Sequence, residues 1–314
     1  MKRIMAMLLA VMMVFALCAC GNDGGAQLTF TTGGEQGTYY AFGTVLSQLV
    51  SDKTDTEVTA VSGKGSQANV EDLDAGAAQL AFVQSDVMSY AYGGKNLFTE
   101  KVDSFSVVAA LYMEQVQIVT LDPSIKTVAD LEGKTVSIGA KGSGVYFNAL
   151  DMLGAYGLTE DDIKAEYLDF GDSADSLKDG KIDAAFIVAG APTPAVQDLG
   201  TGKQVYLVSL DKEHIDSLIA SSPYYKEYTI DKEVYDTPED VTTVAVAAVV
   251  IARNDASEDA VYDFVSSVFE NIDEIGHAKK AELSLDFASS ITDVPYHPGA
   301  VKYFAEKDIT VNAA

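Results

Sequence analysis

The chain has 314 residues, 48% of them apolar and 22% charged, which suits a globular protein with room for two domains. Its formal charge is −26 at pH 7. Such an acidic surface repels nucleic acid and anionic lipid headgroups, so neither is an expected partner. Arginine occurs only at Arg3 and Arg253, which leaves little scope for a bidentate guanidinium site for an anion.

The N-terminus has the pattern of an export signal. Lys2 and Arg3 precede an apolar run over residues 4–17 that is too short to span a bilayer, and small residues follow it. We therefore expect a signal peptide over residues 1–19.

The end of this signal, Leu17-Cys18-Ala19-Cys20, resembles a bacterial lipobox. The resemblance implies lipidation of Cys20, and the polar residues that follow suit a flexible tether over residues 20–26. We therefore expect an extracytoplasmic lipoprotein, anchored to the membrane at the cell surface or in the periplasm. A plain signal peptide that is cut nearby is the alternative.

An α/β unit occurs twice along the chain. The first copy predicts a strand over 28–31, a Gly-rich turn over 33–37, a helix from 38 to about 50, a strand over 57–61, a helix from 66 and a buried strand over 79–83. The second copy predicts a strand over 135–138, a Gly-rich turn over 139–144, a helix from 145 to about 156 and a buried strand over 183–187. Gly37, Tyr39, Tyr40 and Leu46 are matched by Gly144, Tyr146, Phe147 and Leu153 at one constant spacing.

Two such units predict an α/β chain with two lobes, because strands that alternate with helices form a mostly parallel sheet covered on both faces. Chance similarity between crossovers is the alternative. Apolar segments over 105–111 and 115–121 would carry the chain to lobe two, and 241–251 would carry it back. We expect lobe one over 27–114 plus 245–314, lobe two over 115–244, and a two-crossing hinge between them.

The cleft between the lobes is the expected binding site, because each Gly-rich turn follows a strand and leads into a helix. The first amides of a helix lack partners within it, and the helix dipole favours negative charge there. Glycine also allows a ligand to approach the backbone closely. These features predict a carboxylate held by backbone amides and hydroxyl groups rather than by arginine.

We expect ligand-binding residues at the ends of strands in both lobes. Some have a structural alternative: Ser66 as a helix cap, Asn69 as a surface residue and Tyr40 as part of the core. The expected residues are Gly37, Thr38, Tyr39, Tyr40, Ser66, Asn69, Gln84 and Asp86 in lobe one, and Ser143, Gly144, Val145, Ala191 and Pro192 in lobe two.

The segment Thr32-Gly33-Gly34-Glu35-Gln36-Gly37-Thr38-Tyr39-Tyr40 resembles the TAXI solute-binding proteins of tripartite ATP-independent periplasmic (TRAP) transporters. Further matches follow in order: Gly65-Ser66-Gln67-Ala68-Asn69, Phe82-Val83-Gln84-Ser85-Asp86, Gly139-Ala140-Lys141-Gly142-Ser143-Gly144 and Gly190-Ala191-Pro192-Thr193. The resemblance implies a type II periplasmic-binding-protein fold, TRAP integral-membrane subunits as partners, and a small carboxylate such as glutamate, glutamine or 2-oxoglutarate as ligand. Val145 stands where the family usually has threonine, which favours a less polar or differently placed group on the ligand.

Motifs for enzyme chemistry are missing from the sequence. The histidines, His214, His277 and His297, lie outside the Gly-rich turns, and the chain has no nucleophile elbow and no zinc-binding His-Glu-x-x-His pair. We therefore expect no catalytic residue, no metal and no cofactor. The alternative function is a binding or sensor lobe of the same fold that serves an ATP-driven transporter or a signalling receptor.

Overall fold

A computed structural model describes residues 25–96 and 98–313. The expected signal peptide over 1–19, the lipidation site Cys20 and most of the expected tether lie outside the described residues. Within the described ranges, no helix combines the length and the apolar character needed to cross a bilayer.

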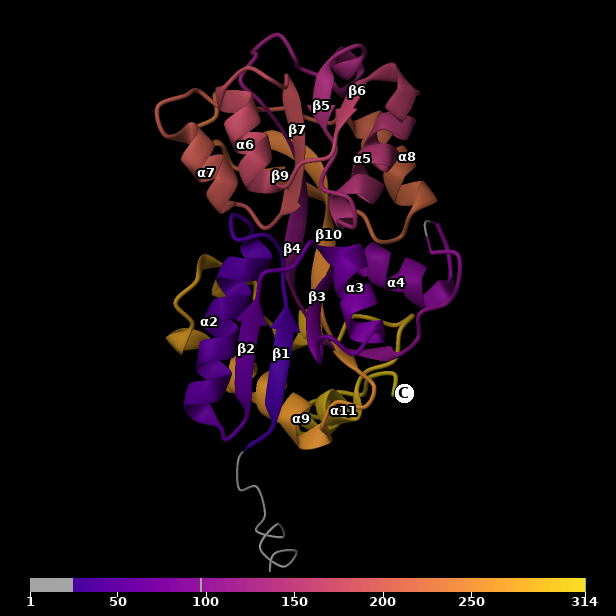
Figure 1. Ribbon diagram of the computed structural model, residues 1–314, viewed down its shortest axis with the longest axis vertical. Helices are drawn as coiled ribbons and strands as arrows, with labels where there is room; N and C mark the ends of the chain where they lie inside the picture. Colours follow the sequence, from indigo (N-terminus) through magenta and orange to yellow (C-terminus); the bar gives the residue numbers. More distant parts are fainter. Residues whose placement is uncertain (1–24, 97, 314) are drawn as a thin grey trace, which may run out of the picture.

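The described strands form one mixed sheet of ten strands (Figure 1). Its order is β2-β1-β3-β10-β4-β7-β5-β6, with β8 beside β4 and β9 beside β10. The strands are β1 (Gln27–Thr31), β2 (Glu57–Val61), β3 (Leu80–Gln84), β4 (Phe105–Thr120), β5 (Thr135–Ser137), β6 (Lys164–Glu166), β7 (Ala184–Ala189), β8 (Tyr206–Leu207), β9 (Lys226–Ile230) and β10 (Val241–Arg253).

Helices cover both faces of this sheet (Figure 1). They are α2 (Thr38–Lys53), α3 (Ser66–Asp74), α4 (Ser85–Gly93), α5 (Gly144–Ala155), α6 (Phe170–Lys178), α7 (Pro194–Gly200), α8 (Lys212–Ser221), α9 (Glu258–Glu270), α10 (Leu285–Ala288) and α11 (Pro298–Glu306). Short 3-10 helices are η2 (Val128–Leu131), η3 (Glu160–Asp162), η4 (Lys232–Val234), η5 (Ile272–Glu274) and η6 (Ala278–Glu282).

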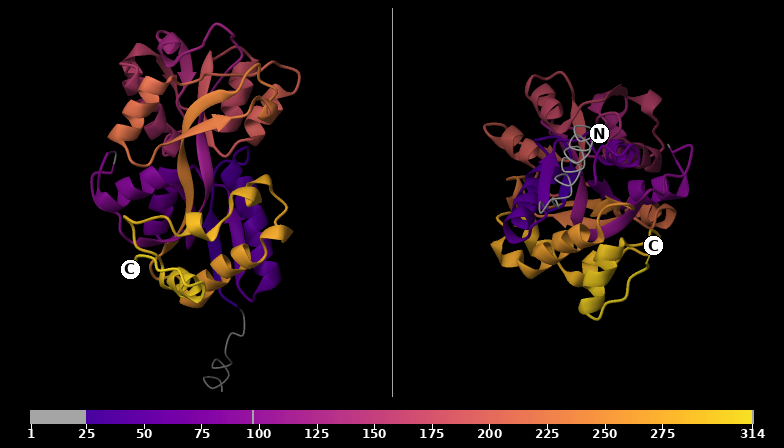
Figure 2. Two further views of the ribbon diagram at one scale, coloured as in Figure 1. Left: turned by 180° about the vertical axis from the view of Figure 1, so that it is seen from behind. Right: turned by 60° about the horizontal axis from the view of Figure 1, so that its bottom comes forward.

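The molecule has two lobes that share the long strands β4 and β10 (Figures 1 and 2). Lobe one contains β1–β3, α2–α4 and α9–α11, and lobe two contains β5–β9 and α5–α8. A strand of 16 residues such as β4 extends for roughly 50 Å, which is long enough to pass through both lobes. Its first part pairs antiparallel with β10, and Gln115–Thr120 pairs antiparallel with β7.

The sequence explains why lobe two needs helices on both sides of its sheet. In β7, Ala184, Phe186 and Val188 belong to one apolar cluster, whereas Ala185, Ile187 and Ala189 belong to another. Because successive side chains of a strand point to opposite faces, an apolar residue at every position buries both faces.

The expected α/β two-lobed class is confirmed, and two details differ from the expectation. The segments 105–111 and 115–121 belong to the single strand β4, because Tyr112, Met113 and Glu114 between them pair with β10. The lobes also do not have separate parallel sheets. Strands β1–β3 and β5–β7 are parallel groups, and the antiparallel β4 and β10 join them. The lobe boundaries at 114/115 and 244/245 stay a prediction.

Candidate functional site

A cavity of about 710 Å³ lies between the lobes. Its lining comes from residues at and after the carboxyl ends of β1, β2 and β3 in lobe one and of β5, β6 and β7 in lobe two, together with Glu114 of β4. Parallel strands bring their carboxyl ends to one edge of a sheet. Each lobe therefore presents loops and helix starts to the other.

Four helices begin at this cavity. The N-caps of α2, α3 and α5 are Gly37, Gly65 and Ser143, and within the described chain none of the three caps its helix through a side chain. Helix α6 differs, because the carboxylate of Asp169 accepts a hydrogen bond from the N–H of Asp172 at 2.8 Å. In α3 the N–H of Ala68 donates to the carbonyl oxygen of Gly142 at 2.9 Å. The first-turn amides of α2 and α5 and the first two amides of α3 have no competing side-chain acceptor, which favours an anionic group there.

Two glycines of these turns have distinct roles. Gly65 has a φ of 104°, which glycine adopts far more readily than other residues. At Gly144 the requirement is steric, because a Cβ atom would lie 1.5 Å from Oε1 of Gln84. Gln84 belongs to lobe one and Gly144 to lobe two, so the missing side chain allows the lobes to meet.

The deep wall of the cavity contains buried polar atoms. The hydroxyl of Ser66 accepts a hydrogen bond from the backbone N–H of Gln84 at 3.1 Å. The hydroxyl oxygen of Ser143 and Oε1 of Gln84 are buried and have no hydrogen-bond partner among the described residues. Buried polar atoms are nearly always paired in native proteins, so a bound solute would satisfy groups of this kind.

Glu114 and Tyr39 form a buried pair at the base of the cavity. The hydroxyl of Tyr39 donates to Oε2 of Glu114 at 3.0 Å, and Glu114 is only 2% exposed. Burial raises the pKa of the Glu114 carboxyl well above its usual value. The neutral acid is therefore favoured over a wider pH range, which weakens its repulsion of an anionic ligand.

The rim of the cavity is charged. Lys64 from lobe one and Lys141 from lobe two are its basic residues, and neither forms a salt bridge within the described parts of the chain. The Lys141 ammonium lies 4.7 Å from the ring centre of Tyr167, a distance suited to a cation–π contact. The exposed carboxylates Glu35, Asp169, Asp172 and Asp175 also line the cavity.

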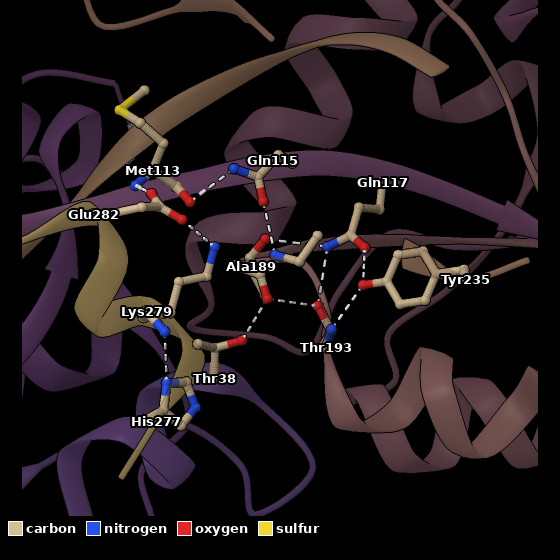
Figure 3. A network of polar contacts seen from close by, with 12 residues as sticks. Thr38, Met113, Gln115, Gln117, Ala189, Thr193, Tyr235, His277, Lys279 and Glu282 are labelled. Atoms are coloured by element: carbon tan, nitrogen blue, oxygen red, sulfur yellow. Dashed lines mark hydrogen bonds and ion pairs between the residues drawn. The ribbon is translucent and has the colours of Figure 1, made fainter. Parts of the chain in front are cut away.

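Beside the cavity, polar side chains form a network where β4 crosses between the lobes (Figure 3). The hydroxyl of Thr38 donates to the carbonyl oxygen of Gly190 at 2.8 Å. Oε1 of Gln115 accepts from the N–H of Ala191 at 2.7 Å, and Nε2 of Gln117 donates to the hydroxyl of Thr193 at 3.0 Å. The Thr38 hydroxyl therefore serves a contact between the lobes.

The structure brings many of the expected ligand-binding residues together. The cavity lining includes Gly37, Thr38, Tyr39, Ser66, Gln84, Ser143, Gly144 and Val145. It does not include Tyr40, Asn69, Asp86, Ala191 and Pro192. Their role in ligand binding stays a prediction.

The contacts of Asn69 and Asp86 explain why these two residues lie outside the lining. The side-chain amide of Asn69 donates to the carbonyl oxygens of Thr32 and Phe82 at 2.6 and 2.8 Å, which ties α3 to two neighbouring segments. Asp86 is fully buried and accepts a hydrogen bond from Asn148 of lobe two at 2.8 Å.

Several lining residues were not expected from the sequence. Lys141 lies inside the Gly-rich turn over 139–144, and Lys64 directly precedes the matched segment that begins at Gly65, so their position was a usable signal. Asp169 and Phe170 follow β6 and begin α6, which is the same strand-to-helix pattern without glycine before the helix. Glu114 carries no such signal, because it lies within a strand.

Among the described residues, no cluster of three or more His, Cys, Asp or Glu side chains is arranged to hold a metal ion.

The α/β topology and the cavity between two lobes define the class of type II periplasmic-binding-protein folds. The sequence model of the NMT1-like family matches residues 30–307, so the chain belongs to the NMT1-like family. The fold is similar to that of the alkanesulfonate-binding protein SsuA from Xanthomonas axonopodis pv. citri bound to MOPS, with a TM-score of 0.50 and 16% identity over 90% of this chain and 91% of that one.

Two further solved structures share this fold. PhnD1 from Prochlorococcus marinus (MIT 9301), in complex with methylphosphonate, has a TM-score of 0.53 and 13% identity over 82% of this chain and 88% of its own. A protein from Bordetella bronchiseptica RB50 has a TM-score of 0.55 and 17% identity over 90% and 89% of the two chains. SsuA is named as a binding protein rather than an enzyme, as expected for this chain.

The comparisons contradict the expected resemblance to TAXI proteins of TRAP transporters. The matching family is the NMT1-like family, and the similar structures include sulfonate- and phosphonate-binding proteins. The short Gly-rich motifs misled the family prediction because Gly-rich turns before a helix start occur in several unrelated anion-binding folds. TRAP membrane subunits are therefore no longer expected as partners.

Proposed function

We propose that the chain is an extracytoplasmic solute-binding protein that encloses a small carboxylate between its lobes and presents it to the membrane subunits of an ATP-driven transporter. The observation that carries the proposal is the convergence of three helix starts without side-chain caps, from both lobes, on one cavity. Amides from both lobes can then contact one anionic group, so binding and lobe closure are coupled.

The charges of the cavity support an acidic ligand. Lys64 and Lys141 lie at the rim on opposite lobes, and the neutral form of Glu114 is favoured at the base. The names of the similar structures support the same chemistry, because SsuA was solved with MOPS and PhnD1 with methylphosphonate. Both ligands carry an oxyanion, and SsuA is named for alkanesulfonates.

A thermal-shift screen tests the proposal. The probes are matched carboxylates, sulfonates and phosphonates of the same chain length, with the corresponding neutral amides as controls. A ligand at a hundred times its Kd adds about 2.7 kcal/mol to the free energy of unfolding, which raises Tm by several degrees. We expect carboxylates to raise Tm and amides to leave it unchanged.

Each other outcome has a definite meaning. A shift with sulfonates or phosphonates alone would overturn the carboxylate and retain the solute-binding protein. No shift with any acid would overturn anion binding at the helix starts.

Membrane anchoring through Cys20 is a separate part of the proposal and rests on the lipobox pattern. Radioactive palmitate should label the wild-type chain in cells, and the Cys20→Ala variant should carry no label and leave the membrane fraction. Equal labelling of the two chains would contradict it.

A further inference from the structure

A cluster of buried polar side chains connects the lobes beneath the cavity wall. This interlobe cluster consists of Gln84 and Asp86 from lobe one and Asn148, Tyr225 and the half-buried Asp151 from lobe two. Asn148 and Asp86 are 0% exposed, Tyr225 is 1% exposed and Gln84 is 2% exposed. The arrangement is separate from the hinge contacts of β4.

Asn148 lies at the centre of the interlobe cluster. Its Oδ1 accepts from Nε2 of Gln84 at 2.9 Å, and its Nδ2 donates to Oδ2 of Asp86 at 2.8 Å and to the hydroxyl oxygen of Tyr225 at 2.9 Å. The Tyr225 hydroxyl in turn donates to Oδ2 of Asp151 at 2.8 Å. The side chain of Asn148 in lobe two therefore forms hydrogen bonds with two side chains of lobe one, Gln84 and Asp86.

The acceptors determine the direction of each amide. Oδ2 of Asp86 accepts, so the NH₂ group of Asn148 faces it and the carbonyl of Asn148 faces Gln84. Gln84 must then direct its own NH₂ group at Asn148. This ordered arrangement needs both lobes in contact, because its members come from both sides of the interface.

The interlobe cluster also adjoins the ligand cavity. Gln84 lines the cavity, whereas Asn148 does not. Asn148 lies one helical turn after Gly144, the first residue of α5. Lobe closure therefore removes the interlobe cluster from water in the same step that closes the cavity wall.

We propose that Asn148 is a positioning residue that holds the two lobes closed without contacting the ligand. When the lobes separate, water replaces the bonds of Asn148. When they close without its amide, Gln84 and Asp86 are buried without partners, which is unfavourable. The inference concerns closure itself and rests on the proposed function only in that closure encloses the solute.

The mouth of the cavity offers a probe of closure that needs no ligand. Gln36 of lobe one and Gly171 of lobe two both line the cavity, and a Cβ atom at Gly171, in the first turn of α6, would lie 3.9 Å from Cβ of Gln36. This separation is near that of a disulfide. Cysteines at both positions, in the full chain with Cys18 and Cys20 changed to Ser, should crosslink only when the lobes are closed.

The experiment compares crosslinking rates in this two-cysteine background. Asn148→Ala should slow crosslinking about tenfold, because loss of a buried partner disfavours closure. The control is Asn271→Ala, since Asn271 bonds only within lobe one, to the carbonyl oxygen of Ser267 at 2.9 Å. It should leave the rate unchanged. An unchanged rate in Asn148→Ala, with Tm retained, would overturn the proposal.

A second variant keeps the test decisive if Asn148→Ala does not fold. Asn148→Asp has nearly the same shape but has no NH₂ group for Asp86 and faces it with a second carboxyl. Crosslinking relative to the Asn271→Ala control should be slow near neutral pH and recover in acid, where one carboxyl is protonated. A purely structural role would give no such recovery, and equal ratios at both pH values would overturn the proposal. Neither measurement involves an acid ligand, so failure here is distinct from failure of the thermal-shift screen.

Discussion

The two Gly-rich turns before α2 and α5 are alike in sequence but need their glycines for different reasons. In the first turn, a Cβ atom at Gly37 would lie 3.2 Å from the carbonyl oxygen of Gly34 and 3.4 Å from the ring of Phe170, which small shifts can relieve. In the second turn, Gly139 and Gly142 have φ values of 88° and 87°. Gly144 then meets Gln84 of the other lobe.

The comparison teaches that one motif can serve two physical purposes. The first turn mainly leaves the amides of α2 free of a side-chain cap. The second turn does the same for α5 and also sets the distance at which the lobes meet. Substitutions that add one methyl group to each turn should therefore have unequal effects.

The largest expected effect is that of Gly144→Ala. The new methyl group would displace Gln84 and break its hydrogen bond to Asn148, so affinity for the acid that gives the largest thermal shift should fall by about a hundredfold. Titration calorimetry measures Kd, and circular dichroism checks that the lobes stay folded. Unchanged affinity would show that the lobes do not meet at this glycine.

The next prediction concerns Asp86, which belongs to the same interlobe cluster as Gln84. Burial raises the pKa of the Asp86 carboxyl to about 6, so the folded chain binds a proton that the unfolded chain releases between about pH 4 and 6. The contribution of the Asp86 carboxyl to the free energy of unfolding is therefore greatest at low pH and is lost as the pH rises through that window. Its cost near pH 7 is on the order of 3 kcal/mol.

Asp86→Asn keeps an oxygen for Asn148 and removes the titration. Urea unfolding should show that the stability of the variant relative to wild type increases by about 2 kcal/mol between about pH 4.5 and about pH 7. The titratable neighbours Glu114, Asp151, Tyr90 and Tyr225 are present in both chains. The charge of Asp86 helps to raise the pKa of Glu114, so its removal stabilises the variant at high pH in the same direction. A difference that does not change with pH would contradict the raised pKa.

A smaller effect should come from the two lysines at the rim of the cavity. Lys64→Ala and Lys141→Ala should each lower the association rate of an anionic ligand by about threefold at low salt and leave its dissociation rate nearly unchanged, because a rim charge acts mainly on encounter. Stopped-flow measurements at low and high salt test this. The control is Lys126→Ala, because Lys126 is exposed in the turn after β4, at the edge of lobe two opposite the cavity. An equal loss in the control would mean that only net charge matters.

The smallest expected effect is that of Gly37→Ala. The neighbours of the new methyl group can move by a few tenths of an ångström, so affinity should change by less than about threefold. The calorimetry used for Gly144→Ala provides the direct comparison. A larger loss here than at Gly144 would reverse the roles assigned to the two turns.

The sequence alone determined which segments form strands and helices and which helix starts line the cavity. The expected helix from 38 to about 50 is α2, the expected strand over 57–61 is β2, and the expected helix from 145 to about 156 is α5. These predictions succeed because hydrophobic periodicity and glycine before a helix act through near neighbours. For the same reason the cavity lining includes Gly37, Ser66 and Ser143.

Only the tertiary structure decided which distant residues meet. Gln84 and Asn148 are far apart in sequence, and so are Tyr39 and Glu114, yet both pairs are buried hydrogen-bonded contacts. Asp86 was expected in the binding site because it follows β3, but packing of the two lobes places it under the cavity wall with Asn148. Local preferences set the elements, whereas burial and closure of the lobes select such contacts, because removing a polar group from water requires a partner that the neighbouring sequence does not contain.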